Sequence, residues 1–140
     1  MKVFLDASLL IYLNIPLKEA EAKLIESFYR SLLDEELYTD VLVLDEVIYV
    51  SERKYKVKVG ETLEFIDRAV LPYVEVLPLT LEEYLRAKKH ILEYGLPPSD
   101  ALHLAVMDSN GIGVIATEDA DFDKTHVKRL WIGKGWRGGS

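Results

Sequence analysis

The 140-residue chain contains no cysteine, which excludes disulfide frameworks, thiolate zinc sites and cysteine-based catalysis. No apolar run approaches the roughly 18 residues of a membrane span, and the longest, residues 9–13, ends at Asn14. The N-terminus also lacks the charged, apolar and small-residue regions of a signal peptide. We therefore expect a cytoplasmic protein with no membrane partner.

A surplus of basic residues is also missing, because 24 acidic residues against 17 basic ones give a net charge of −7. Residues 124–140 hold five of the basic residues and no acidic one, so the rest of the chain is more acidic still. A domain that binds nucleic acid through bulk charge is basic overall. If this chain handles a phosphate polyanion, it needs a metal ion or a local basic patch.

The chain alternates short apolar segments with segments of helical period, which predicts an α/β fold. The expected strands are residues 2–6, a short strand near 38, 73–77, 113–117 and 127–132. The expected helices are residues 18–33, 41–54, 60–71, 80–94 and 99–109. We predict a three-layer α/β/α sandwich with a short, mainly parallel central sheet over residues 1–132, followed by a flexible glycine-rich tail over 133–140.

Acidic residues follow two of the expected strands. Asp6 comes directly after the first strand, and Asp119 and Asp121 follow the strand at 113–117. In parallel α/β sheets, binding sites form outside the carboxyl ends of the strands. Each acid also has an ordinary structural interpretation, since aspartate is favoured at helix N-caps and in turns.

Two further acids lie in predicted helices. Asp100 is in the first turn after a Pro-Pro break, where it complements the helix dipole without any further role. Glu46 lies beside a stripe formed by Val43, Val47 and Val50, with no charged neighbour one turn away. Because acids are seldom buried unpaired, Glu46 predicts a partner or a metal ion.

Bringing these acids together has an electrostatic cost. Two like charges about 5 Å apart repel by roughly 3 kcal/mol at an effective dielectric constant near 20. A divalent cation between the carboxylates turns this repulsion into attraction. Oxygen ligands without cysteine favour Mg²⁺ or Mn²⁺ over zinc, and such ions commonly bind phosphates and activate water.

The acids occur in four short motifs: Leu5-Asp6-Ala7-Ser8, Val43-Leu44-Asp45-Glu46-Val47, Pro98-Ser99-Asp100-Ala101-Leu102-His103-Leu104-Ala105 and Thr117-Glu118-Asp119-Ala120-Asp121-Phe122. In order and spacing, over roughly residues 1–132, these motifs resemble the PIN-domain family of metal-dependent ribonucleases. The resemblance is strongest to the compact VapC-type toxins of toxin–antitoxin pairs.

The resemblance implies a site and its partners. The metal-site acids would be Asp6, Glu46, Asp100 and Asp119, with Asp121 as a fifth, while the hydroxyls of Ser8 and Thr117 would orient carboxylates. The cofactor would be one or two Mg²⁺ or Mn²⁺ ions, and the reaction would cleave RNA to 5′-phosphate and 3′-hydroxyl ends. The expected partners are an RNA substrate, a cognate antitoxin and a second copy of the chain. Basic residues expected to contact phosphates are Arg53, Lys54, Lys56, Lys128, Arg129, Lys134 and Arg137.

The histidines are interpreted without a functional role. His103 lies one helical turn after Asp100 and so could reach the site, but a histidine at such a position is more often a half-buried packing residue, which is the interpretation we favour. His90 and His126 form no ligand spacing with it.

Other protein classes fit less well. A haloacid-dehalogenase-like phosphatase needs a second aspartate where Ser8 stands, and a response-regulator receiver needs paired acids at the end of the first strand. A Rossmann or P-loop nucleotide binder needs a glycine-rich first turn, and residues 6–9 contain no glycine. Two alternative interpretations are kept: an RNA-processing nuclease outside a toxin system, and a catalytically silent interaction module.

Overall fold

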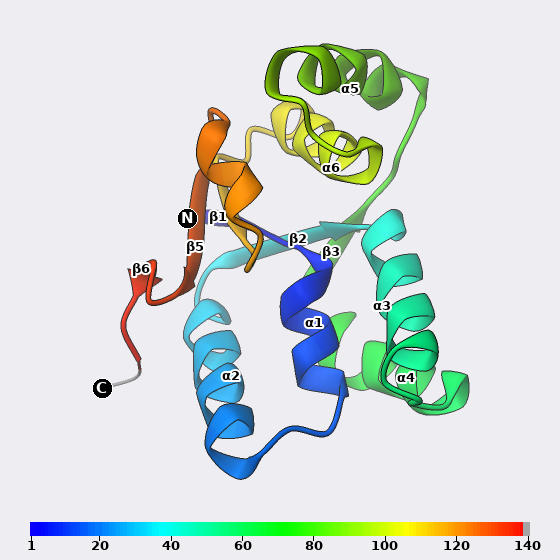
Figure 1. The fold of residues 1–140 in the computed structure, drawn as a ribbon, viewed down its shortest axis with the longest axis vertical. Helices are drawn as coiled ribbons and strands as arrows, with labels where there is room; N and C mark the ends of the chain where they lie inside the picture. Colours follow the sequence, from blue (N-terminus) through cyan, green and yellow to red (C-terminus); the bar gives the residue numbers. More distant parts are fainter. Residues whose placement is uncertain (139–140) are drawn as a thin grey trace.

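A six-stranded sheet runs through the middle of the molecule, a computed structural model in which residues 1–138 are described (Figure 1). Its strands are β1 (Lys2–Leu5), β2 (Glu36–Asp40), β3 (Val74–Leu77), β4 (Val114–Ala116), β5 (Lys128–Ile132) and β6 (Gly135–Trp136). The strand order is β3-β2-β1-β4-β5-β6, and every neighbouring pair is parallel. The expected parallel sheet is confirmed.

Helices cover both faces of this sheet, so the predicted three-layer α/β/α sandwich is also confirmed (Figure 1). The helices are α1 (Ala7–Asn14), α2 (Glu19–Leu32), α3 (Val41–Arg53), α4 (Val59–Phe65), α5 (Leu81–Tyr94) and α6 (Pro98–Ser109). Helices α1–α4 lie on one side of the sheet in Figure 1, and α5 and α6 lie on the other. Within residues 1–138, no helix is both long enough and apolar enough to cross a lipid bilayer.

Two local elements differ from the sequence expectations. Helix α1 was not predicted, because its apolar residues surround the helix instead of forming one stripe, as in a helix that is buried on all sides. The segment predicted as one helix over 60–71 forms α4 and then η1 (Ile66–Val70), a π-helical turn. The amide of Leu71 donates to the carbonyl of Ile66, five residues back, and Pro72 follows directly.

The strand order of the sheet changes direction between the neighbouring strands β1 and β4. The strands β2 and β3 extend the sheet on one side of β1, and β4, β5 and β6 extend it on the other. Leu5 at the end of β1 is in register with Ala116 at the end of β4, and the amide of Asp6 donates to the Ala116 carbonyl at 3.1 Å. Open parallel sheets form their crevice at such a reversal, outside the carboxyl ends of the two strands.

Residues 133–136 of the expected tail contact the rest of the domain. The amide of Gly133 donates to the carbonyl of Trp136 at 2.7 Å, and β6 pairs with β5. The rings of Trp136 and Trp131 both pack against Phe28 of α2, at centroid distances of 5.2 and 5.3 Å. This aromatic packing holds the segment on the domain, while residues 139–140 of the predicted tail lie outside the described residues.

Candidate metal-binding active site

Four acids that are far apart in the sequence line one pocket at the strand reversal. Asp6, Glu46, Asp100 and Asp119 surround a cavity of about 410 Å³. They come from the end of β1, the middle of α3, the first turn of α6 and the loop after β4, respectively. The structure thus brings together four of the five acids that were predicted from the sequence.

Asp6 is the most deeply placed of these acids. One carboxylate oxygen accepts from the amide of Ala7 at 2.8 Å and so caps α1, and the other accepts from the Thr117 hydroxyl at 2.8 Å. Burial raises the pKa of Asp6, whereas the nearby charge of His103 and the two hydrogen bonds act in the opposite direction. The side chain is therefore fixed in one orientation and remains a ready ligand for a cation.

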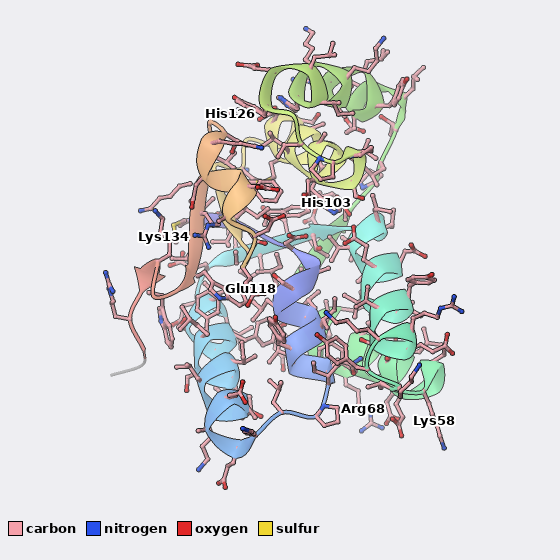
Figure 2. All side chains as sticks on the ribbon, viewed as in Figure 1. Lys58, Arg68, His103, Glu118, His126 and Lys134 are labelled. Carbon is pink, nitrogen blue, oxygen red and sulfur yellow. The ribbon has the colours of Figure 1, made fainter. Side chains whose placement is uncertain are left out.

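Glu46 has the partner that its position predicted. Its carboxylate accepts from Nε2 of His103 at 3.0 Å, and 31% of its side chain is exposed toward the pocket opening. Figure 2 labels His103 below α6, on the side of that helix that faces the sheet. The imidazole therefore connects α6 with α3 across the pocket floor.

Asp40 holds the other side of the same imidazole. One of its carboxylate oxygens caps α3 by accepting from the amide of Val43 at 2.9 Å, and the other accepts from Nδ1 of His103 at 2.7 Å. Both Asp40 and His103 are fully buried. A carboxylate in this position fixes the orientation of the imidazole, which in turn orients Glu46.

The surroundings of the buried His103 imidazole favour its protonated form. Burial alone would lower its pKa, but the hydrogen bonds to Asp40 and Glu46 and the negative charges of Asp40 and Asp6 raise the pKa to about 10. Its Nε2 lies 3.9 Å from Asp6. The interpretation of His103 as a packing residue is therefore wrong, because this imidazolium supplies positive charge under the acidic pocket.

Asp100 experiences the crowding of negative charge most directly. Burial, followed by the charges of Asp6 and Asp119, raises the pKa of Asp100 to about 7. A shift of this kind shows that the folded chain disfavours a full set of ionised carboxylates when no cation is present. Such perturbed groups in a cleft are typical of functional sites.

The loop after β4 is held by several contacts. The Thr117 hydroxyl donates to Asp6 and accepts from the amide of Asp119 at 3.1 Å, so it joins two acids of the pocket. Arg129 of β5 pairs with Asp123 and donates to the Thr117 carbonyl at 3.3 Å. Arg129 therefore supports the loop, and its guanidinium is already engaged in the folded chain.

Two nominated residues are placed differently from the others. Ser8 lines the pocket, but its hydroxyl accepts from the amide of Glu118 at 3.2 Å and, among the contacts of residues 1–138, does not orient a carboxylate. Asp121 is exposed in η2 (Ala120–Lys124), outside the pocket lining, and its amide donates to the Asp119 side chain at 2.9 Å. A backbone contact of Asp121 thus helps to orient Asp119, the N-cap of η2.

Asp40 was not predicted as a site residue, because an aspartate directly before a helix is sufficiently explained by N-capping. The usable signal was its position, since Asp40 ends the strand next to β1 and strand ends at this edge share the crevice. For His103, the signal was its spacing of one turn from Asp100.

The donor set fits a hard divalent cation. All four converging groups offer carboxylate oxygens, and Asp6, Glu46 and His103 also form a cluster whose ligand atoms lie within 4.8 Å of one another. Because Nδ1 and Nε2 of His103 both bond carboxylates, the imidazole orients ligands and carboxylate oxygens remain to face the pocket. Oxygen-only coordination is the preference of Mg²⁺ and Mn²⁺.

A comparison with protein families agrees with this geometry. The PIN-domain model matches residues 3–128, and the chain therefore belongs to the PIN-domain family, a family of nucleases. No sequence among curated proteins matches the chain significantly.

Solved structures with the same fold include several toxins. VapC20 of Mycobacterium tuberculosis, described as a sarcin-ricin loop cleaving toxin, superposes with a TM-score of 0.70 at 19% identity, covering 86% of this chain and 92% of that one. VapBC2 of Rickettsia felis, solved with promoter DNA, gives a TM-score of 0.67 at 16% identity over 94% and 98% of the two chains. PAE2754 of Pyrobaculum aerophilum gives 0.61 at 24% identity, over 92% and 83%.

Proposed function

We propose that this chain is a divalent-metal-dependent endoribonuclease and the toxin of a toxin–antitoxin pair. The observation that carries the nuclease proposal is the pocket in which Asp6, Glu46, Asp100 and Asp119 converge. The raised pKa of Asp100 supports it, because a group of acids that resists full ionisation is relieved by a bound cation. Mg²⁺ or Mn²⁺ is the proposed cofactor. Its charge reconciles an acidic protein with an RNA substrate.

In such a reaction, some residues of the pocket would bind the ion and others would orient those ligands. When bound, the ion supplies positive charge at the scissile phosphate and makes a water molecule more acidic for in-line attack. Asp6, Glu46, Asp100 and Asp119 would hold it. Thr117 fixes one face of Asp6, and the Nε2–H of His103 fixes Glu46. These side chains are already hydrogen-bonded in place, so little reorganisation accompanies binding.

Cleavage assays test this proposal directly. We expect the purified chain with Mn²⁺ or Mg²⁺ to cleave members of a panel of structured and single-stranded RNAs, and EDTA to abolish the cleavage. A 5′-phosphate on the products would identify the expected bond. A chain that binds the ion and cleaves none of these RNAs would instead be the interaction module that the sequence left open.

The toxin assignment rests on structural similarity. Besides VapC20, similar structures include the VapBC2 complex and a toxin–antitoxin complex from Klebsiella pneumoniae, the latter with a TM-score of 0.60 at 19% identity. We expect a cognate antitoxin encoded next to this chain, and the two proteins should co-purify when they are expressed together. A cytoplasmic location is part of this proposal, because an RNA substrate and an antitoxin would both be met there. Growth that is unaffected when the chain is expressed alone would favour an RNA-processing nuclease outside a toxin system.

The homodimer stays a prediction. Helix α5 exposes several large apolar side chains, namely Leu81, Tyr84, Leu85 and Leu92, which is consistent with a partner on this helix. Light scattering at micromolar concentration should give twice the chain mass of 16.0 kDa, and a monomer mass would contradict the prediction.

A further inference from the structure

We propose that His90, Asp108 and His126 form a second metal site, which binds a zinc-class transition-metal ion outside the acidic pocket. His90 belongs to α5, Asp108 to the last turn of α6, and His126 to the segment between η2 and β5. One ligand atom from each residue lies within 4.8 Å of the others. None of the three lines the acidic pocket.

The three side chains already point toward one another. Nε2 of His90 is 2.7 Å from one carboxylate oxygen of Asp108, and Nε2 of His126 is 2.7 Å from the other. The two imidazole centroids are 5.4 Å apart. Both histidines therefore direct Nε2 toward the one carboxylate of Asp108, so an ion beside that carboxylate could bind all three residues.

Outer contacts hold the imidazoles in these orientations. The Tyr94 hydroxyl bonds Nδ1 of His126 at 2.8 Å, and the Tyr94 ring stacks on His90 with 19° between the planes. A hydrogen bond to the second ring nitrogen is the usual support of a metal-binding histidine, since it fixes the tautomer that leaves Nε2 free for the metal.

The His90 ring is mostly buried, but only one of its two nitrogens has a hydrogen-bond partner among residues 1–138. Only 12% of its side chain is exposed, and Nδ1 has no hydrogen-bond partner among residues 1–138. An unpaired polar group in such a place costs about 1–3 kcal/mol, and a native case calls for an explanation. The whole polar function of the ring therefore falls on Nε2, the atom that faces Asp108 and His126.

The ligand atoms of this second site favour a different kind of ion than those of the acidic pocket do. Two imidazole nitrogens and one carboxylate oxygen suit Zn²⁺ and its borderline neighbours, whereas Mg²⁺ prefers oxygen ligands alone. Three protein ligands leave one tetrahedral position for water. The His126 side chain is 43% exposed, so this position opens to solvent.

An ion at this site would connect three segments of the fold. It would join α5 and α6 to the segment that follows η2, and η2 begins directly after Asp119. Phe122 of η2 is fully buried, so η2 is anchored to the core between the second site and Asp119. The ion would therefore stabilise the loop that carries Asp119 without contacting the reaction centre.

Metal binding to the tag-free full chain tests the proposal, with Zn²⁺ titrated in the presence of excess Mg²⁺. We expect one Zn²⁺ per chain in the wild type and in Asp6→Asn, which alters the acidic pocket. In His126→Gln, a change at a half-exposed position, the affinity should fall at least about tenfold, in line with the loss of a direct ligand. His90→Gln provides a second variant, and circular dichroism checks that both variants fold.

Cobalt supplies an independent measurement, because Co²⁺ in a four-coordinate nitrogen and oxygen site absorbs visible light far more strongly than in an octahedral oxygen site. The visible bands should persist in Asp6→Asn and disappear in His126→Gln. Zinc binding that is lost in Asp6→Asn and retained in His126→Gln would overturn the second site, as would the absence of zinc binding in the wild type. Neither experiment uses RNA, so its outcome is independent of the proposed nuclease activity.

Discussion

Helix α6 carries a cluster of carboxylates and imidazoles at each end, and the two clusters differ in the ratio of acid to histidine. Near the first turns, the single imidazole of His103 lies among Asp6, Asp40 and Glu46. Near the last turn, the single carboxylate of Asp108 lies between two imidazoles, those of His90 and His126. In the first cluster both ring nitrogens of the histidine bond carboxylates, so carboxylate oxygens would bind the proposed ion. In the proposed second site the imidazole nitrogens themselves would be the metal ligands. The same two residue types would therefore prepare one site for a hard ion and the other for a borderline ion.

Removing an acid from the acidic pocket should have the largest effect. We expect Asp100→Asn to lower RNA cleavage about 1,000-fold, or about 4 kcal/mol of transition-state stabilisation, because one cation ligand is lost. The metal-free variant should also unfold at a higher temperature than the wild type, since the repulsion that raises the pKa of Asp100 is gone. Asp45→Asn on α3 is the matched control, because Asp45 is exposed beside Glu46, and its cleavage rate should be unchanged. Equal losses in the two variants would contradict the assignment.

The fully buried His103 and the partly buried His90 should differ in what they contribute to stability without metal. His103→Leu should lower the free energy of unfolding by about 3–5 kcal/mol, because it leaves the buried carboxylates of Asp40 and Asp6 without their cation. His90→Leu removes one hydrogen bond to a partly exposed acid but also removes the Nδ1 that has no partner among residues 1–138, so the net cost should be about 1 kcal/mol or less. Urea denaturation measures both, and similar values would remove the distinction between the clusters.

Removing the Thr117 hydroxyl, which Asp6 and Asp119 share, should have a smaller effect on cation binding in the acidic pocket. Thr117→Val keeps the shape but leaves Asp6 and the Asp119 amide without their common partner. We expect Mn²⁺ affinity to fall about 10–100-fold, as is common when a residue that orients a metal ligand is lost. Thr125→Val, whose hydroxyl bonds only the Phe122 carbonyl and the Val127 amide, should leave the affinity unchanged in the same titration.

Acid pH should weaken cation binding in the acidic pocket. The pKa of Asp100 is raised from 3.8 to about 7, so ionised Asp100 destabilises the folded metal-free chain above pH 7, and protonation relieves this as the pH falls. Protons and metal compete for the same carboxylate, so the rise in unfolding temperature caused by Mn²⁺ should shrink as the pH drops from 8 to 6. Thermal scans at these two pH values should show it, and an equal rise at both would be inconsistent with Asp100 as a ligand.

The strand-end acids were predictable from the sequence, because Asp6 and Asp119 follow apolar segments and parallel strands direct their carboxyl ends to one edge. The role of His103 was not, since its contact with Asp40 joins residues 63 positions apart and both residues satisfied local rules as a packing residue and a cap. The contacts of residues 133–136 were missed for the same reason. Local glycine content indicated a tail, whereas the packing of Trp136 on Phe28 depends on contacts across the fold.

Thermal unfolding of the wild type and Asp6→Asn, each with and without Mn²⁺ at pH 8, tests the acidic pocket most directly. The substitution keeps the shape of the side chain and its cap on α1 but removes one converging charge. We predict that Mn²⁺ raises the unfolding temperature of the wild type in a concentration-dependent manner by mass action, and that most of this gain is lost in the variant. An equal rise in unfolding temperature in both proteins, or no rise in the wild type, would contradict a cation site formed by the carboxylates of Asp6, Glu46, Asp100 and Asp119.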